Sequence, residues 1–415
     1  MVISLLISSQ ANNDGGFILD GTGFPTASLR GMQFDDYSSL RVTQFDTMQR
    51  GRRIYQLVVL VTSSLCAYRA GRAHQQSNMA CVRENPRKHD VFTSRSLVKS
   101  SEPTPATSRC STDFVRYEPS NLEKIWHSKI QYIQSDEHSW SRGCELLQED
   151  LDQIVHLLNE INKHNTDRSS ASLSNTSLSA FHYRDSCTGD SSVVYIEPLI
   201  SFLRHPLSLC TYPNTASADI LDKSYLLVPY REEVMTSNTR KFLFDAGAST
   251  YDTGAGGASQ SWFVNKYRSR GIEFDRIIGW EAAPTDSSEQ WGSVPADVKR
   301  ITSWFNIPVK TEIDSADNPF TFIKHLTEPE DFVVFKLDID TPVVEMELVK
   351  QFMEDSTLIT LIDEFYFEHH VSGSPMQWHG WGDLQGLKTP MRQLADSYEL
   401  FASLRHRGVR AHSWV

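Results

Sequence analysis

The chain of 415 residues lacks several motifs that would assign a function directly. No two cysteines stand at C-x-x-C spacing, which argues against a zinc site built on cysteines. Neither G-x-G-x-x-G nor G-x-x-x-x-G-K-[ST] occurs, so a standard dinucleotide clamp and a P-loop are both disfavoured. G-x-S-x-G is also absent and no cysteine follows Cys210, which makes a hydrolase with a serine or cysteine nucleophile a poor candidate.

Basic residues are in short supply as well. The 40 lysines and arginines are outnumbered by 52 acidic residues, and the formal net charge is −12. Because nucleic-acid binding needs a basic surface that displaces counterions from phosphates, we expect no nucleic-acid partner. The hydrophobic fraction of 40% suffices for a sizeable core, and the length allows one large domain with accessory segments or two domains.

The six cysteines all precede the glycine-rich stretch that begins at Gly247. They are Cys66, Cys81, Cys110, Cys144, Cys187 and Cys210. The last four could form disulfides if the chain enters the secretory pathway. In a cytosolic chain they would be free buried thiols, and the sequence leaves both alternatives open.

The N-terminal part contains one apolar stretch, Ile54–Ala70, which is uncharged as far as Arg69 and follows Arg53. Its length is at the lower limit for crossing a bilayer, and we predict a single-pass signal anchor there. This would place the protein in the secretory pathway, in a Golgi-like location. A cleaved signal after a start at Met48, or a buried segment of a cytoplasmic protein, are the alternatives. Residues 1–53 are predicted to be poorly ordered, and 71–116, polar and without a period, to form a stem or linker.

Residues 117–224 are predicted to form a largely helical accessory region. Ser120 and Glu123 have the spacing of a capping box at the start of a helix. A second amphipathic helix is predicted over Leu147–Ile161. The Ser/Thr/Asn-rich stretch that follows, 164–192, is predicted to be a surface loop, and Tyr225–Val228 has the composition of a strand.

The stretch from Lys241 to Pro284 is the most informative part of the chain. It predicts a buried strand at Phe242–Phe244, a glycine-rich loop, a helix over Ala258–Arg270 and a second strand at Arg276–Trp280, which ends in Glu281. This succession is typical of the start of a doubly wound α/β sheet that binds an adenosine-containing cofactor. The loop glycines let the backbone approach a ligand closely, and they are Gly247, Gly254, Gly256 and Gly257.

Helices and strands continue to alternate after Glu281. Residues 225–415 are therefore predicted to form a mostly parallel, Rossmann-like sheet with both faces covered. The predicted elements are a helix at Pro295–Phe305, a strand at Ile307–Val309, a helix at Phe320–Leu326, a strand at Phe332–Ile339, a helix from Pro342, a strand at Leu358–Ile362, a helix from Pro390 and a strand at Val409–Val415.

Acidic residues recur where the predicted strands end. They are Asp245, Glu281, Asp338, Asp340, Asp363, Glu364 and Glu368. Because ligands bind beyond the carboxyl ends of strands in open parallel sheets, these acids are candidates for a shared site. Asp338 and Asp340 lie on one side of a strand end by the period of two. A metal site of these two residues, Glu368 and a histidine is chemically possible, whereas helix caps and a solvated loop are the structural alternatives.

As a set, Phe244–Ala248, Trp280–Glu281, Phe335–Asp340 and Leu361–His370 resemble the motifs of the FkbM-type methyltransferases, which belong to the class I S-adenosylmethionine-dependent superfamily. The resemblance covers about Leu226–Val415. It implies that Asp245, Gly247 and Ala248 hold the methionine end of the cofactor, that Glu281 holds its ribose, and that Lys336–Ile339 lies beside the transfer site. The chain departs from the family pattern at Ser249–Thr253, where the glycine loop is longer, and at Asp340–Pro342.

These observations lead to the hypothesis of an S-adenosyl-L-methionine-dependent O-methyltransferase that acts on a glycan or a small-molecule acceptor. An oxygen acceptor benefits from a general base, for which Asp338, Asp340 and His369 are the candidates. A membrane-anchored glycosyltransferase that uses Asp338-Ile-Asp340 as a D-x-D site is the second enzymatic reading. A third is a non-catalytic Rossmann-like protein that binds a partner through the helices of 120–163.

Overall fold

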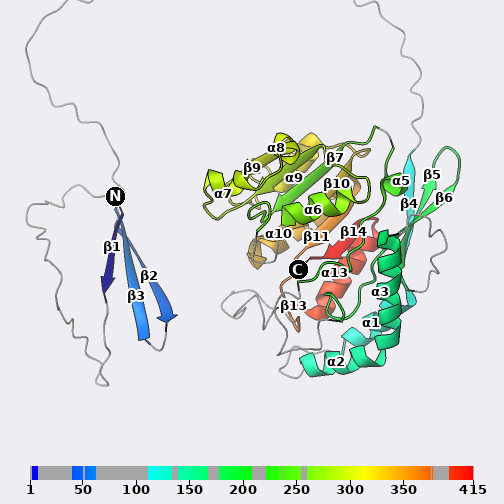
Figure 1. Cartoon of the computed structure of the whole chain (residues 1–415), viewed down its shortest axis with the longest axis horizontal. Helices are drawn as coiled ribbons and strands as arrows, with labels where there is room; N and C mark the ends of the chain where they lie inside the picture. Colours follow the sequence, from blue (N-terminus) through cyan, green and yellow to red (C-terminus); the bar gives the residue numbers. More distant parts are fainter. Residues whose placement is uncertain are drawn as a thin grey trace, which may run out of the picture. The chain divides into compact units, whose positions relative to one another are not determined.

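The computed structural model describes residues 2–7, 40–49, 52–61, 111–132, 139–166, 177–207, 221–236, 238–253, 259–374, 376 and 392–414. The chain divides into two compact units, Met1–Lys99 and Ser100–Val415. The first unit contains a three-stranded antiparallel sheet in the order β1-β3-β2, made of β1 (Val2–Ile7), β2 (Leu40–Gln49) and β3 (Arg52–Val61) (Figure 1). β1 and β2 lie in the range predicted to be poorly ordered, and β3 overlaps the predicted anchor, of which 62–70 lie outside the described residues. Among the residues that the structure describes, no helix is both long and apolar enough to cross a membrane.

A six-stranded parallel sheet forms the centre of the second unit. Its order is β14-β11-β10-β7-β8-β9, and every neighbouring pair is parallel. The strands are β7 (Lys241–Ala246), β8 (Arg276–Trp280), β9 (Thr302–Phe305), β10 (Phe332–Leu337), β11 (Glu364–Phe367) and β14 (Arg410–Ser413). Numbered along the chain, this order is 3-2-1-4-5-6, which is a doubly wound topology with its switch point between β7 and β10. The predicted parallel α/β sheet is confirmed.

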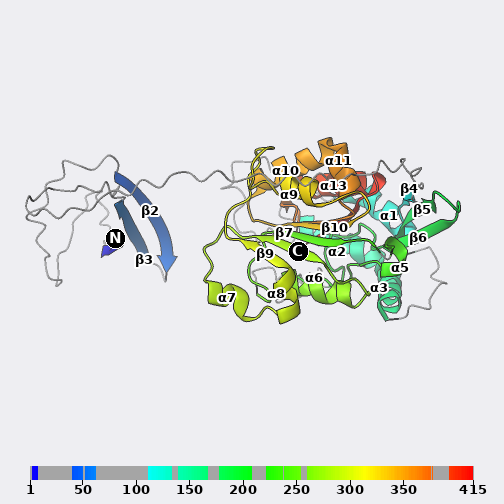
Figure 2. The same ribbon diagram turned by 90° about the horizontal axis from the view of Figure 1, so that it is seen from above.

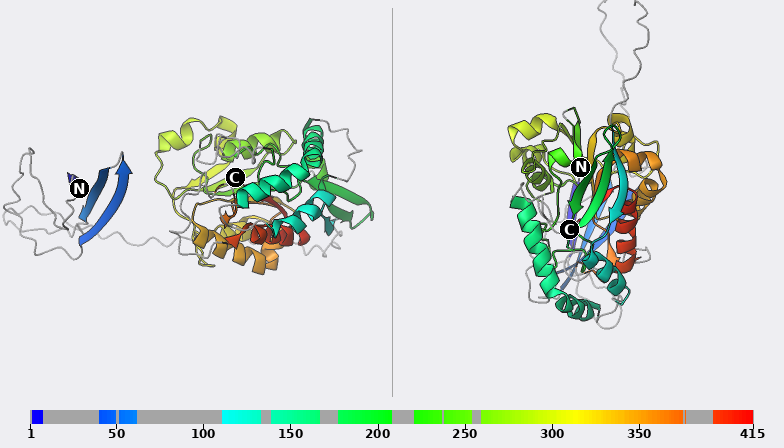
Figure 3. Two further views of the ribbon diagram at one scale, coloured as in Figure 1. Left: turned by 90° about the horizontal axis from the view of Figure 1, so that it is seen from below. Right: turned by 90° about the vertical axis from the view of Figure 1, so that its right-hand side faces the viewer.

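Helices cover both faces of this sheet. Figure 2 shows α6 (Ser259–Arg268), α7 (Ser287–Gly292) and α8 (Ala296–Ile301) on one face. The other face carries α9 (Pro319–Leu326), α10 (Pro342–Glu354), α11 (Ser356–Leu361) and α13 (Leu394–His406) (Figure 3). Because both faces are covered, the central strand β10 is buried along its whole length, which explains its continuous apolar run. A short parallel pair, β12 (Val371–Ser372) and β13 (Arg392–Gln393), precedes α13.

A helix cap and a strand pairing explain why two predictions were wrong. The apolar run Leu358–Ile362, predicted as a strand, lies mostly in α11, because the Asp355 side chain accepts hydrogen bonds from the amides of Thr357 and Leu358 and starts a helix. The predicted helix Pro295–Phe305 ends at Ile301, and its last four residues form β9 by pairing with β8. Consequently the predicted strand at Ile307–Val309 is not one.

The accessory region is a mixture of strands and helices. Its antiparallel sheet consists of β4 (Thr112–Glu118), β5 (Ser179–Asp185) and β6 (Ser191–Ile196), and its helices are α1 (Asn121–Ile130), α2 (Ser139–Glu149), α3 (Leu151–Thr166) and α5 (Arg231–Val234). The Ser120 cap is confirmed, since its hydroxyl accepts from the amide of Glu123 at 3.1 Å. β4 lies partly in the predicted linker and β5 in the predicted loop, whereas Tyr225–Val228 is buried but not a strand.

The accessory region shares its hydrophobic core with the central sheet. Trp126 of α1, Ile154 of α3 and Phe202 belong to the same buried cluster as Phe244 of β7 and Phe335 of β10. Figure 1 shows α1 and β4 on the side of the sheet where α13 and β14 lie. The accessory region is therefore part of one folding unit with the sheet.

Candidate functional site

A buried ion triad lies at the topological switch point. Asp245 on β7 and Lys336 on β10 are paired in register, and Asp338 follows β10 by one residue. The Lys336 ammonium lies 3.3 Å from Asp245 Oδ1 and 3.1 Å from Asp338 Oδ2, and it donates a 2.6 Å hydrogen bond to the carbonyl of Gly247. The lysine therefore joins the carboxyl ends of the two strands between which the sheet order reverses.

Mutual attraction keeps Lys336 and Asp338 charged. Burial alone would lower the pKa of Lys336, but the two carboxylates raise it above its ordinary value. Burial would raise the pKa of Asp338, but Lys336 and a hydrogen bond with Glu368 hold it below the usual range. For Asp245, burial outweighs the attraction of Lys336 and raises the pKa. Asp338, ion-paired and with a depressed pKa, is consequently a weak proton acceptor.

The first turn of the glycine loop packs directly on β10. Gly247 has φ +83°, and a Cβ at this position would stand 1.5 Å from the Asp338 carbonyl oxygen. The amides of Gly247 and Ala248 both donate to the carbonyl of Trp280 at 3.0 Å. Only glycine fits this close approach, so the glycine predicted to serve a ligand is required by the backbone packing itself.

Glu281 lies at the end of β8 and faces the same loop. Its Oε2 accepts a hydrogen bond from the Ser249 amide at 2.9 Å, and its Oε1 accepts from the Ala283 amide at 2.7 Å. The side chain is only partly buried. Each carboxylate oxygen keeps lone-pair capacity for a further donor. The carboxyl ends of β7 and β8 thus meet, as the sequence analysis assumed, while Gly254, Gly256 and Gly257 lie outside the described residues.

A second group of side chains follows β10 and β11. His370 Nε2 lies 3.7 Å from Asp340 Oδ1 and 3.7 Å from Glu368 Oε2, and its Nδ1 lies 3.2 Å from Glu345 Oε2. Asp340 has φ +51°, a left-handed backbone that aspartate tolerates better than most residues. Asp340, Glu368 and His370 each offer one ligand atom, and these three atoms lie within 4.8 Å of one another, which is suitable for holding a metal ion.

Burial and neighbouring charge shift the acid–base properties of this group. Burial, reinforced by Asp338, raises the pKa of Glu368 to about 8. Burial would lower the pKa of His370, but contacts with Asp340 and Glu345 raise it to about 10. Without a bound cation, His370 is therefore the positive partner of these carboxylates.

The structure places the predicted His369 differently from its neighbour. His369 Nδ1 lies 3.1 Å from the Ser397 hydroxyl, and its ring stacks on Phe367, so it packs against α13. His370, one of the two candidates for the unspecified histidine of the predicted metal site, joins Asp340 and Glu368, whereas Asp338 does not belong to this group. The alternation that pairs Asp338 with Asp340 would equally have paired Glu368 with His370, two residues apart. Glu345, one turn into α10, carried no comparable signal.

A positively charged wall completes the surroundings of Asp338. The Trp414 indole donates to Asp338 Oδ2 at 3.1 Å, and its backbone carbonyl accepts from Arg204 Nη1 at 3.1 Å. Arg204 Nη2 lies 3.9 Å from Glu368 Oε1, and the Lys223 ammonium stands 4.7 Å from the Trp414 ring centroid. Burial, followed by the charge of Arg204, lowers the pKa of Lys223 to about 8. The sequence analysis predicted none of the residues Arg204, Lys223 and Trp414 at the site.

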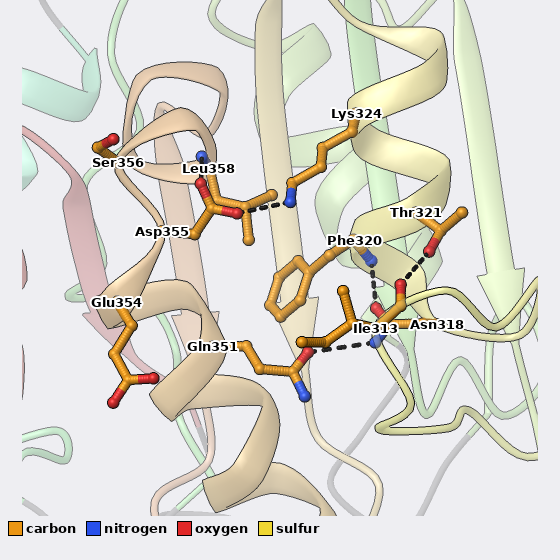
Figure 4. Close-up of a pocket in the computed structure, with 10 residues that line it drawn as sticks. All are labelled: Ile313, Asn318, Phe320, Thr321, Lys324, Gln351, Glu354, Asp355, Ser356 and Leu358. Carbon is orange, nitrogen blue, oxygen red and sulfur yellow. Dashed lines mark hydrogen bonds and ion pairs between the residues drawn. The ribbon is translucent and has the colours of Figure 1, made fainter.

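A separate pocket of about 320 Å³ lies among α9, α10 and α11 (Figure 4). Part of its polar lining is mutually satisfied, since Lys324 pairs with Asp355 at 2.5 Å and Asn318 Nδ2 donates to Gln351 at 3.2 Å. None of the candidate site residues lines this pocket. It is therefore distinct from the switch-point site.

Comparisons with known proteins add no information on the switch-point site. No family model matches this chain, and neither a curated protein nor a solved structure matches it.

Proposed function

We propose that this protein is an S-adenosyl-L-methionine-dependent methyltransferase that transfers the methyl group to an oxygen of a glycan or small-molecule acceptor. One observation carries the proposal. The loop after β7 and the acid after β8 adjoin at the carboxyl edge of the sheet, where the Ser249 amide donates to Glu281 at 2.9 Å, beside the switch point of a 3-2-1-4-5-6 sheet. Sheets of this order bind nucleoside-containing ligands at that edge.

The residues at this edge fit an adenosine-containing cofactor in different degrees. Glu281 fits the ribose role, because its partly exposed carboxylate retains acceptor capacity for two hydroxyl groups. Asp245 does not fit a direct contact, because it is fully buried and engaged by Lys336 and Ser259. Its proposed part is to hold Lys336, which in turn holds the Gly247 carbonyl.

Bound S-adenosylmethionine would supply an electrophilic methyl group on a sulfonium. The acceptor oxygen would take the methyl carbon, and the electron pair of the broken carbon–sulfur bond would remain on the thioether. The protein mainly has to align donor and acceptor and to receive the hydroxyl proton. Of the three predicted bases, Asp340 is the best placed, because its side chain is 78% exposed whereas Asp338 is ion-paired and His369 packs against α13.

The D-x-D glycosyltransferase reading receives less support. Its two carboxylates would have to face one metal ion, but Asp338 is bound by Lys336 and Trp414 whereas Asp340 lies with His370.

Calorimetry with S-adenosylhomocysteine tests the proposal. The full chain is needed, because α1 and α3 share the core of the sheet. We expect saturable binding to the native protein, a loss of about tenfold in Glu281→Gln, and no change in Glu289→Gln, a matched exposed acid on α7. Absence of binding, or equal affinities of the two variants, would reject the cofactor assignment, and a response to a nucleotide sugar with Mn²⁺ instead would favour the glycosyltransferase.

The proposed location in the secretory pathway has one structural support. Cys187, in the turn between β5 and β6, is disulfide-bonded, and disulfides persist mainly in oxidising compartments. Peptide mapping of the protein from its own cells, alkylated without reduction, should recover Cys187 in a disulfide-linked peptide. Recovery of Cys187 as the free alkylated thiol would favour the cytoplasmic alternative.

A further inference from the structure

The ligand atoms of Asp340, Glu368 and His370 all lie within 4.8 Å of one another. His370 Nε2 stands 3.7 Å from Asp340 Oδ1 and 3.7 Å from Glu368 Oε2. Two ligand atoms bound to one small divalent cation at about 2.1 Å stand between about 3.0 and 4.2 Å apart. The two separations from Nε2 fall within this range.

The imidazole is also oriented as in metal sites. His370 Nδ1 lies 3.2 Å from the carboxylate of Glu345, which is almost completely buried and whose other oxygen accepts from the Ile339 amide at 2.9 Å. A carboxylate behind a histidine fixes the tautomer, and it leaves the second ring nitrogen free to coordinate. Here that second nitrogen, Nε2, points to the pair Asp340 and Glu368.

We infer that Asp340, Glu368 and His370 form a divalent-cation site, with Glu345 as the positioning residue behind His370. Two carboxylates and one imidazole favour a first-row ion such as Mn²⁺ or Zn²⁺ over Ca²⁺, which takes oxygen ligands. Three protein ligands leave coordination positions open. The exposed side chain of Asp340 gives solutes access to them.

The ion would act on the acceptor. A hydroxyl bound at an open position would become more acidic, which assists its attack on a methyl group. Because Asp340 offers the ion one carboxylate oxygen, its second oxygen would remain to receive the proton. This role rests on the proposed function, whereas binding of the ion does not. A titration without any cofactor therefore separates the failure of one proposal from the failure of the other.

The test is a Mn²⁺ titration of the full chain after chelator treatment and dialysis, followed by calorimetry and electron paramagnetic resonance. We expect one saturable site per chain and a coupling of the bound ion to a histidine nitrogen. Asp340→Asn should weaken binding at least tenfold while it preserves the fold, because the side chain is exposed and asparagine tolerates φ +51°. Asp314→Asn, which alters an exposed acid outside the cluster, should stay within twofold of the native affinity.

His370→Gln should abolish the nitrogen coupling. If that buried variant does not fold, the comparison of Asp340→Asn with Asp314→Asn decides by itself. A chain that shows no saturable Mn²⁺ binding, equal affinities of the two aspartate variants, or bound Mn²⁺ without nitrogen coupling in the native protein would each overturn the site. In those cases His370 serves only as the cationic partner of the three carboxylates.

Discussion

Two buried groups of charged residues in the second unit differ in how tightly they are packed. The first, here called the junction network, connects the accessory region to the end of the sheet and consists of Glu123, Glu197, Glu364, Arg405, Arg410 and His412. Its shortest ion pairs join Arg410 Nε to Glu364 Oε1 and His412 Nδ1 to Glu197 Oε1, at 2.7 Å each. The other ion pairs of the network measure 3.2 to 3.9 Å. All six residues are buried.

The second group, Asp340, Glu345, Glu368 and His370, is looser. Its contacts range from 3.2 to 3.7 Å, and the side chain of Asp340 is largely exposed. Charges buried without water need close partners, whereas charges that serve a ligand must leave space for it. The contrast leads us to expect that the junction network contributes more to the stability of the fold than the looser group does.

The largest expected effect comes from breaking the junction network at Arg405. This guanidinium is fully buried, lies 3.2 Å from Glu197 and 3.4 Å from Glu123, and donates to the Tyr117 hydroxyl. Arg405→Met leaves the buried carboxylate of Glu123 without its cation and leaves Glu197 with only His412, and we expect a loss of about 3–5 kcal/mol in the free energy of unfolding. Urea denaturation measures it.

Arg142→Met is the matched control, because Arg142 pairs with Glu145 at the surface and should contribute less than about 1 kcal/mol. Equal losses in the two variants would contradict the assignment of the junction network to stability.

The next effect concerns the packing of the loop that follows β7. Gly247→Ala combines a left-handed backbone with a Cβ that would overlap the Asp338 carbonyl, and we expect a destabilisation of at least about 2 kcal/mol. Gly292→Ala serves as the control, since nothing lies within 4 Å of its Cβ position and its change should be neutral or slightly stabilising. Thermal unfolding of both variants measures the two changes in stability. An unchanged melting temperature for Gly247→Ala would show that the loop does not need glycine at this contact with β10.

A third prediction uses pH to probe the seam between α3 and the sheet. His164 is buried between Tyr195 and Tyr230, and burial, with the charges of Arg270, Arg410 and Lys266, lowers its pKa to about 4. In the unfolded chain the pKa of this histidine is about 6.5, so the unfolded state binds the proton more readily than the folded state does. The stability that neutral His164 contributes above pH 6.5 is therefore lost as the pH falls towards 4.

For His164 this loss amounts to about 2 kcal/mol between pH 6.5 and 4.5. His164→Gln should therefore show a correspondingly flatter decline of unfolding free energy over that interval than the native chain. Parallel curves for the two proteins would mean that the histidine is hydrated or paired in the folded state.

The smallest expected effect on stability comes from a change in the looser group. Asp340→Asn should change the free energy of unfolding by less than about 0.5 kcal/mol, because the side chain is exposed and the backbone conformation suits asparagine. Urea denaturation in the absence of metal measures this change. A large destabilisation would show that the looser group also holds the fold, and the contrast between the two groups would then disappear.

Much of the sheet could be predicted from local patterns. The continuous apolar runs gave β7, β8 and β10, and Pro342 marked the start of α10 as predicted. The run Leu358–Ile362 was assigned wrongly, because a short apolar run suits a buried strand and a buried helix equally and the Asp355 cap decides between them. β4 and β5 were missed because their strand character depends on antiparallel partners distant in sequence.

The candidate site, too, could be predicted only in part from local patterns. Asp245, Gly247, Glu281, Asp338 and Asp340 were named from strand ends, and all of them lie at the carboxyl edge of the sheet. Asp363 and Glu364, named in the same way, stand instead at the amino end of β11, because the run before them is a helix and not a strand. Period two and strand ends are local properties, so the sequence by itself determined only part of the set of acids at this edge. Only the tertiary structure decided that Lys336 neutralises Asp338, that Glu345 stands behind His370, and that Arg204 and Trp414 close the far side. Ion pairing, burial and the direction of a side chain depend on residues that are distant in the sequence and come into contact across the sheet. Local sequence patterns do not predict such contacts.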